Sequence, residues 1–222
     1  MKLAAKILAV ALISLVAVNL SAQKAAKPFE GYVKYGLDLQ GENVDASTRA
    51  QMPSEIGVYY KSQKVRTEMI TAMYSVITIS DVANGSMIQM FEMMGMKFYV
   101  EQTADDIAKM KGDNDEKPEI KLIDESKTIA GYNCKKAEIT KDGETMEVYY
   151  TDEIAVPFDK NSQYQIEGIN GILMEYVVDQ QGMTITFRAK EVKKAKQKPA
   201  LFTVPSDFEK KTLDEFNSMF GG

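Results

Sequence analysis

The stretch of sequence that decides the fold runs from Tyr74 to Met94 and reads YSVITISDVANGSMIQMFEMM. Asn84 and Gly85 lie near its middle, and both residue types tolerate the positive φ angles that a tight hairpin turn requires. On either side, Tyr74 to Asp81 and Ser86 to Met94 are rich in residues that favour strands. The stretch therefore predicts two antiparallel strands joined by a short turn.

Similar strand and turn patterns recur in both directions from this hairpin. From Phe29 to Leu39, apolar and polar residues alternate with a period of two, as in a half-buried strand. Further strands are predicted over 54–61, 64–71, 96–102, 119–128, 132–141, 144–151, 171–179 and 183–193. About ten or eleven strands, joined mostly by short turns, favour one antiparallel meander over alternating strands and helices.

Two short helices are predicted beside these strands. Thr103 to Asp106 and Thr212 to Glu215 both have the form of a capping box, in which two side chains hydrogen-bond the first backbone N–H groups of a helix. The stretch from Gly41 to Pro53 shows no strand period and is expected to be a mobile loop or a short helix. The predicted fold class is α+β. Because a single sheet of this size curls, we expect an incomplete antiparallel barrel with short helices on its concave face.

The composition excludes several classes of function. The chain has 222 residues, one cysteine, no histidine and a formal net charge of −5. Without histidine there is no serine–histidine triad and no imidazole-ligated metal, and one cysteine forms no intrachain disulfide. The negative charge argues against nucleic acid as a partner. No convergent acid, base and nucleophile set is visible, so we expect no catalysis, metal or cofactor.

The N-terminus has the pattern of a secretory signal. Lys2 and Lys6 precede a short apolar run, Ile7 to Val18, and small residues follow at Ser21-Ala22. We predict a cleaved signal peptide over 1–22, a disordered segment over 23–28 and a single domain over 29–222. The expected location is the periplasm, with the protein soluble or peripheral to the outer membrane.

Methionine is concentrated in one part of the chain. Five methionines lie between residues 87 and 96. Unbranched, polarisable methionine side chains line surfaces that fit variable apolar ligands. One interpretation is therefore a pocket for acyl chains, with Met90, Met94 and Phe98 on its wall. A methionine-filled core is the plainer alternative, and copper(I) bound by thioethers is a third.

Two further side chains, Arg66 and Cys134, are candidates for a functional role, and each also has a plainer structural interpretation. Arg66 lies on a predicted strand between Lys64 and Glu68, where it either forms a surface ion pair or binds a lipid headgroup. Cys134 has Lys135 and Lys136 beside it, and these lysines favour a lowered thiol pKa. Without a histidine nearby, a packed and inert thiol is the preferred interpretation.

Several motifs together resemble a known group of exported proteins. They are Phe29-Glu30-Gly31, Tyr59-Tyr60-Lys61, the stretch Thr128 to Ala137, and Gly168-Ile169-Asn170-Gly171-Ile172-Leu173-Met174-Glu175. The last resembles the motif that names the GLPGLI family, with asparagine at 170 in place of proline. The chain thus resembles exported families of unknown function related to GLPGLI proteins, which are similar in fold to the lipoprotein carriers LolA and LolB. The resemblance implies an unclosed barrel around an apolar cavity.

The function expected from residues and resemblance together is a cell-envelope binding protein. Its ligand would be an acyl lipid, a lipoprotein or another apolar molecule. The alternative is a structural or interaction module of the envelope with a filled core, whose partner is another envelope protein. The predicted interior residues include Val33 and Leu37. The residues predicted to line the ligand cavity are Tyr35, Val58, Tyr60, Met90, Met94, Phe98, Val148, Tyr150, Ile185 and Phe187.

Overall fold

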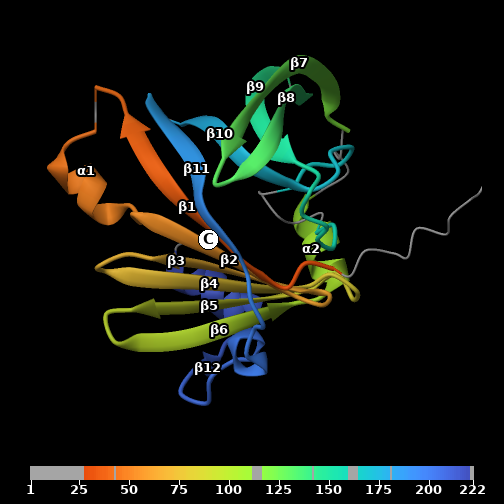
Figure 1. Ribbon diagram of the computed structural model, residues 1–222. Coiled ribbons are helices and arrows are strands. Elements are labelled where there is room, and N and C mark those ends of the chain that lie inside the picture. Colours follow the sequence, from red (N-terminus) through yellow and green to blue (C-terminus); the bar gives the residue numbers. More distant parts are fainter. Residues whose placement is uncertain are drawn as a thin grey trace, which may run out of the picture.

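A computed structural model of the chain describes residues 28–42, 44–111, 117–141, 143–159, 165–180 and 182–220. Within these residues the strands form one twelve-stranded sheet in the order β12-β6-β5-β4-β3-β2-β1-β11-β10-β9-β8-β7. Neighbouring strands are antiparallel, except that the short β12 runs parallel to β6. The sheet has two free edges, β12 and β7, and is therefore unclosed (Figure 1).

The elements follow one another with short connections. The strands are β1 (Gly31–Gln40), β2 (Glu55–Lys61), β3 (Lys64–Ile70), β4 (Tyr74–Asp81), β5 (Ser86–Met93), β6 (Met96–Gln102), β7 (Glu119–Ile129), β8 (Tyr132–Lys141), β9 (Glu144–Thr151), β10 (Ile172–Gln180), β11 (Met183–Lys194) and β12 (Glu209–Lys210). The helices are α1 (Ala46–Gln51), α2 (Ala104–Lys111), the 3-10 helix η1 (Pro199–Phe202) and α3 (Leu213–Phe220).

The predicted meander of strands is confirmed, because each predicted strand is present within about two residues of its expected ends. The two-residue strand β12 was not predicted. The predicted signal peptide over 1–22 lies outside the described residues. So do residues 23–27 of the predicted disordered segment.

One predicted strand end is wrong for a local reason. Strand β5 ends at Met93, and Met94 and Gly95 form the turn into β6 with φ angles of 52° and 80°. A left-handed conformation at two successive residues is typical of a tight hairpin turn. Met94 is therefore outside the strand, and 85% of its surface is exposed.

The capped helices are confirmed at the level of hydrogen bonds. At α2, the backbone N–H of Thr103 donates to Asp106 at 2.9 Å, and the backbone N–H of Asp106 donates to the Thr103 hydroxyl at 3.2 Å. The Thr103 hydroxyl and backbone N–H together lower the pKa of Asp106. Thr212 and Glu215 make the same reciprocal pair at α3. For the stretch from Gly41 to Pro53, the structure has the short helix α1.

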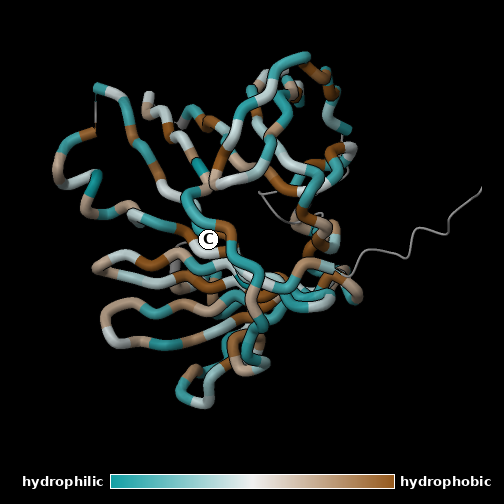
Figure 2. Tube along the Cα trace, in the orientation of Figure 1, coloured by the Kyte–Doolittle hydropathy of each residue, from teal (hydrophilic) through white to brown (hydrophobic). Residues whose placement is uncertain are grey.

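The register of the strands defines an inner and an outer face. Val33 of β1 lies opposite Val58 of β2 on the face that we call inner, and both side chains are fully buried. Figure 1 shows β2–β6 curving away from β7–β10, with β1 and β11 between them. Figure 2 shows hydrophilic and hydrophobic residues mixed along these strands. Buried side chains from β1, β2 and β8–β11 belong to one hydrophobic cluster, so the inner face joins the two halves of the sheet around one core.

The outer face of β3–β6 is covered by the chain's own C-terminal segment, residues 195–208. Phe202 of this segment is buried in a cluster with Ile79 and Met90. The chain then pairs with the edge strand β6 through β12 and continues into α3. There Phe216 contacts Phe91, with ring centroids 4.9 Å apart. Because Phe91 lies on the inner face, the C-terminus crosses from one face of the sheet to the other.

Candidate functional site

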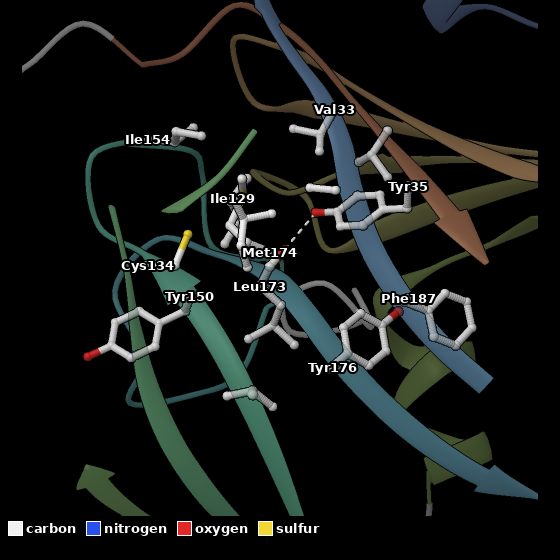
Figure 3. Close-up of a cluster of buried hydrophobic side chains, with 14 of the residues drawn as sticks. Val33, Tyr35, Ile129, Cys134, Tyr150, Ile154, Leu173, Met174, Tyr176 and Phe187 are labelled. Carbon is white, nitrogen blue, oxygen red and sulfur yellow. Dashed lines mark hydrogen bonds between the residues drawn. The ribbon is translucent and has the colours of Figure 1, made fainter. Parts of the chain in front are cut away.

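Seven of the ten residues predicted to line a ligand cavity lie together in the inner core. They are Tyr35, Val58, Tyr60, Val148, Tyr150, Ile185 and Phe187. None has more than 9% of its surface exposed. The Tyr35 hydroxyl donates to the Leu173 carbonyl oxygen at 2.8 Å, which links β1 to β10 (Figure 3). These side chains pack against one another, as residues of a protein core do.

The other three predicted cavity residues do not share a wall. Phe98 faces inward opposite Phe91, whereas Met90 lies opposite Tyr99 on the outer face. Met90 is buried there beneath Phe202, and Met94 lies in the exposed turn. The expectation that these three residues line one side of a cavity is therefore wrong. The spacing of methionines in the sequence does not show which face each side chain occupies, because a turn interrupts the period of two.

Arg66 is held inside the protein rather than presented on its surface. Its Nε donates to Glu68 Oε1 at 2.6 Å, and another guanidinium nitrogen donates to the Leu201 carbonyl oxygen at 2.7 Å. Only 8% of Arg66 is exposed. The ion pair that the sequence suggested is present, and it also anchors the C-terminal segment to the outer face of β3.

Cys134 is fully buried in the inner core, near Ile129 and Ile154 (Figure 3). Burial raises the pKa of its thiol. A raised pKa leaves the sulfur as the less reactive thiol at neutral pH. These surroundings favour the inert interpretation of Cys134.

A second buried charge lies on the outer face of the other half of the sheet. Glu175 of β10 is 9% exposed and forms ion pairs with Lys127 at 2.6 Å and with Arg188. The Lys127 ammonium also lies 3.5 Å from the ring centroid of Tyr149, a cation–π contact. Because both oxygens of the Glu175 carboxylate face a cation, this cluster serves to hold β7, β10 and β11 together.

A different arrangement occurs on the inner face of β3–β5. Thr67 lies opposite Thr78, and Thr78 lies opposite Gln89, so three polar side chains form one row across three strands. All three are half-buried. Within the described residues, none of their side chains makes a hydrogen bond to protein. We call these three residues the hydroxyl–amide row.

Two further polar side chains lie in the neighbouring row of the inner face. Ser80 is 6% exposed and Gln102 is 4% exposed. The Gln102 amide nitrogen donates to the Met110 sulfur at 3.3 Å, but its carbonyl oxygen is buried without a hydrogen-bond partner among the described residues. Buried polar groups in proteins are nearly always hydrogen-bonded, to protein or to water. An unpartnered carbonyl at this position therefore calls for an explanation.

The surroundings of the row are uncharged. On the inner face, the positions flanking it along β2–β6 are occupied by apolar, hydroxyl and amide side chains: Ile56, Met69, Val76, Phe91 and Phe98 on one side, and Tyr60, Val65, Ser80, Met87 and Gln102 on the other. The two buried hydrophobic clusters described above take in no inner-face side chain of β4 or β5. The row thus begins at the edge of the packed core, where Thr67 lies opposite Val58, and its half-buried side chains keep part of their surface exposed.

Sequence reasoning did not find this row. In β4, both alternating sets contain apolar and polar residues, so the strand alone does not show which set faces inward. Thr67, Thr78 and Gln89 come together only through the pairing of β3, β4 and β5. The sequence contained only a weak indication of the row. Hydroxyl and amide residues recur in consecutive predicted strands at positions that face the same side of the sheet once the strands pair.

Comparison with known proteins places the chain in a family. The family described as "N-glycanase peptide, N-terminal domain" matches residues 51–217, more than half of the chain. The chain belongs to this family. Two crystal structures of PNGF-II share its fold, both at 18% identity. In space group P21 the TM-score is 0.52, with 86% of this chain and 33% of that chain covered. In space group C2 these values are 0.50, 85% and 32%. No curated protein matches the sequence.

These comparisons correct the resemblance drawn from short motifs. The chain does not belong with the GLPGLI-related families, and the function expected by analogy with the lipoprotein carriers, binding of lipids or lipoproteins, is overturned with it. The motif glycines have structural roles instead. At Gly171 a β-carbon would lie 1.9 Å from the Thr151 carbonyl oxygen, so the motif keeps glycine where two strands meet closely.

The N-terminal domain family describes one part of an enzyme, and the chain spans about a third of the length of the two PNGF-II structures. Among the described helices, none has the length and hydrophobicity needed to cross a membrane. The described residues also contain no group of three or more acidic, cysteine or histidine side chains arranged to hold a metal ion.

Proposed function

We propose that this chain is an exported recognition domain of the N-glycanase family, which binds N-glycosylated proteins and does no chemistry itself. The observation that carries the proposal is the family match over residues 51–217. An N-glycanase is by name an enzyme of N-linked glycans, and the match is to its N-terminal domain. The proposed export rests on the signal-like pattern of residues 1–22.

The pairing of buried acidic side chains with cations supports a role in binding rather than in catalysis. A general acid or base needs a carboxyl group that reaches the substrate. Two carboxylates with little exposed surface, Glu68 and Glu175, are instead each paired with a cation in contacts that hold strands or the C-terminal segment. The hydroxyl–amide row, by contrast, makes no side-chain hydrogen bond within the described residues, and its hydroxyl and amide groups suit recognition of polar, uncharged groups.

The experiment compares binding and glycan release by the same purified chain. A glycoprotein with a single N-glycan is immobilised beside an enzymatically deglycosylated sample of it, and binding of the chain is followed by biolayer interferometry. We expect binding to the glycosylated form and at least tenfold weaker binding to the other. Equal binding to both forms contradicts glycan recognition.

The same samples are analysed by mass spectrometry after long incubation with the chain. We expect the mass of the glycoprotein to stay unchanged, because the chain alone releases no glycan. Loss of the glycan mass would overturn the non-catalytic part of the proposal, while leaving recognition of N-glycans in place.

A further inference from the structure

We infer that the inner face of β3–β5 is a binding site for an uncharged sugar ring, with Thr67, Thr78 and Gln89 as its hydrogen-bonding residues. The sugar class rests on the proposed function, whereas the location rests on the structure alone. Three features of this face support the site: polar groups without partners among the described residues, strand positions without charge, and an aromatic side chain at its margin.

The first feature is the unused hydrogen-bonding capacity of the row. The three side chains are half-buried and have no hydrogen-bond partner among the described residues. In the next row, the buried carbonyl oxygen of Gln102 is also without one. Partly burying polar groups without partners costs stability, which valine or leucine at the same positions would avoid. A ligand or solvent that supplies the missing hydrogen bonds explains why polar residues are kept at these positions.

The chemistry of the row matches that of a sugar. A threonine hydroxyl donates one hydrogen bond and accepts others, and a glutamine amide does both through separate atoms. Sugar hydroxyls have the same dual character, so either partner can donate. The row crosses three strands at a spacing of about 4.8 Å, and thus extends over roughly 10 Å. That length accommodates one or two sugar rings.

The second feature is that the strand positions around the row carry no charged side chain. No aspartate, glutamate, lysine or arginine occupies the inner-face positions of the row or of the two rows beside it on β2–β6. An anionic sugar or a phosphate would bind here without a counter-charge, and desolvating it would be costly. The site therefore favours a neutral sugar over a sialylated or phosphorylated one.

The third feature is an aromatic side chain next to the row. Phe91 lies two residues from Gln89 on the same face of β5 and is half-buried. It stacks on Phe98 with ring centroids 5.3 Å apart, and it also contacts Phe216 of α3. Binding sites for small molecules commonly combine an apolar wall with a few polar groups that set orientation. Phe91 supplies such a wall for the C–H face of a sugar ring.

The test uses the full chain, a neutral high-mannose N-glycan as the free oligosaccharide, and isothermal titration calorimetry. Thr78→Val removes one hydroxyl and keeps the shape, and Gln89→Leu removes the amide. The matched control is Thr186→Val, a half-buried strand threonine opposite Asp38 on the outer face. We expect affinity to fall about tenfold in each inner-face variant. The melting temperature should stay unchanged or rise, and the control should bind as the wild type does.

The outcomes separate this site from the proposed function. If the wild type binds the oligosaccharide and both inner-face variants bind it equally well, the site is wrong and glycan recognition stands. If the wild type binds the glycoprotein but not the free oligosaccharide, the sugar site is also wrong. Tighter binding of a sialylated glycan overturns the neutral specificity. If the wild type binds neither the free glycan nor the glycoprotein, both the proposed function and the site are wrong.

Discussion

Polar side chains on the two faces of β2–β6 differ in whether they are paired. On the outer face, Arg66 pairs with Glu68 and Lys97 pairs with Asp207 at 2.9 Å, and both contacts involve or adjoin the C-terminal segment. On the inner face of the same strands, Thr78 and Gln89 have no hydrogen-bond partner within the described part of the chain. The C-terminal segment of the chain covers the outer face, whereas polar groups on the inner face remain available for hydrogen bonds to a ligand or to solvent.

This difference indicates that the outer face contributes to stability and that the inner face of β3–β5 contributes to binding. The outer face buries Met90 and Ile79 beneath Phe202, so it contributes to stability through apolar burial and ion pairs. The inner face has polar groups that give little stability where they lie. Proteins commonly accept such a loss where binding requires it. Substitutions of buried residues on the outer face should therefore affect folding, and those of the polar residues on the inner face of β3–β5 should affect ligand binding.

The largest effect is expected for Met90→Asp on the outer face. Met90 is 1% exposed, so the new carboxylate would be buried among apolar side chains without a cation. We expect the free energy of unfolding to fall by about 4 kcal/mol, measured by urea denaturation. Met94→Asp, in the exposed turn of the same hairpin, is the control and should change it by less than about 0.5 kcal/mol. Equal effects of the two substitutions would contradict the assignment of Met90 to a closed face.

The next effect is expected for Arg66→Met, which breaks a buried ion pair. Glu68 would then be left without its cation, and the Leu201 carbonyl would lose a donor. We expect a loss of about 3 kcal/mol in urea denaturation. Limited proteolysis within residues 195–208 should also become faster.

Two variants control for the loss of a charge alone. Arg188→Met removes an exposed arginine from Glu175, which keeps Lys127, so a loss below about 1 kcal/mol is expected. Adding Glu68→Leu to Arg66→Met removes the orphaned carboxylate and should restore part of the stability. A double variant no more stable than Arg66→Met would argue against a buried pair.

A smaller, pH-dependent effect is expected where the C-terminal segment joins β1. Lys61 donates to the Glu30 carboxylate at 2.8 Å and the Gln197 backbone N–H donates to it at 2.9 Å. Both hydrogen bonds lower the pKa of Glu30. A lowered pKa gives stability that is fully present above the ordinary pKa of glutamate and is lost as the pH falls through the lowered value.

The measurement is the melting temperature of the wild type and of Glu30→Gln between neutral and acidic pH. The wild type should melt higher at neutral pH, and the difference should shrink as Glu30 becomes protonated. A difference that stays constant across this range would mean that the charge of Glu30 does not hold the C-terminal segment.

Most of the fold was predictable, because it depends on local signals. The turn at Asn84-Gly85 and the capping box at Thr103 each place an element through contacts within a few residues. The strand β12 was not predictable, since Glu209 and Lys210 form a strand only by pairing with β6, more than a hundred residues earlier. The covering of the outer face by Phe202 depends on the same long-range contact.

The candidate site was not predictable for a related reason. Tyr35 and Val58 were correctly placed in the interior because their strands alternate clearly. Thr78 lies in a strand whose two alternating sets of residues both contain apolar and polar side chains, so alternation does not separate the inner face from the outer. The family was also missed, because short motifs around Gly131 and Gly171 report tight backbone geometry. Such geometry recurs in unrelated β-proteins, and only similarity along most of the chain identified the relatives.

The smallest effect on stability is expected for Gln102→Met on the inner face, and it gives the sharpest comparison with Arg66→Met because both variants introduce the same side chain. Methionine has nearly the length of glutamine but lacks the buried carbonyl oxygen that has no hydrogen-bond partner in the described residues. Replacing an unsatisfied polar group by an apolar one of similar shape is neutral or stabilising. We therefore expect the free energy of unfolding to stay the same or rise by up to about 1 kcal/mol in urea denaturation. A loss as large as that of Arg66→Met would mean that ordered water satisfies Gln102 in the free protein. The Gln102 carbonyl would then no longer count as unused hydrogen-bonding capacity on the inner face.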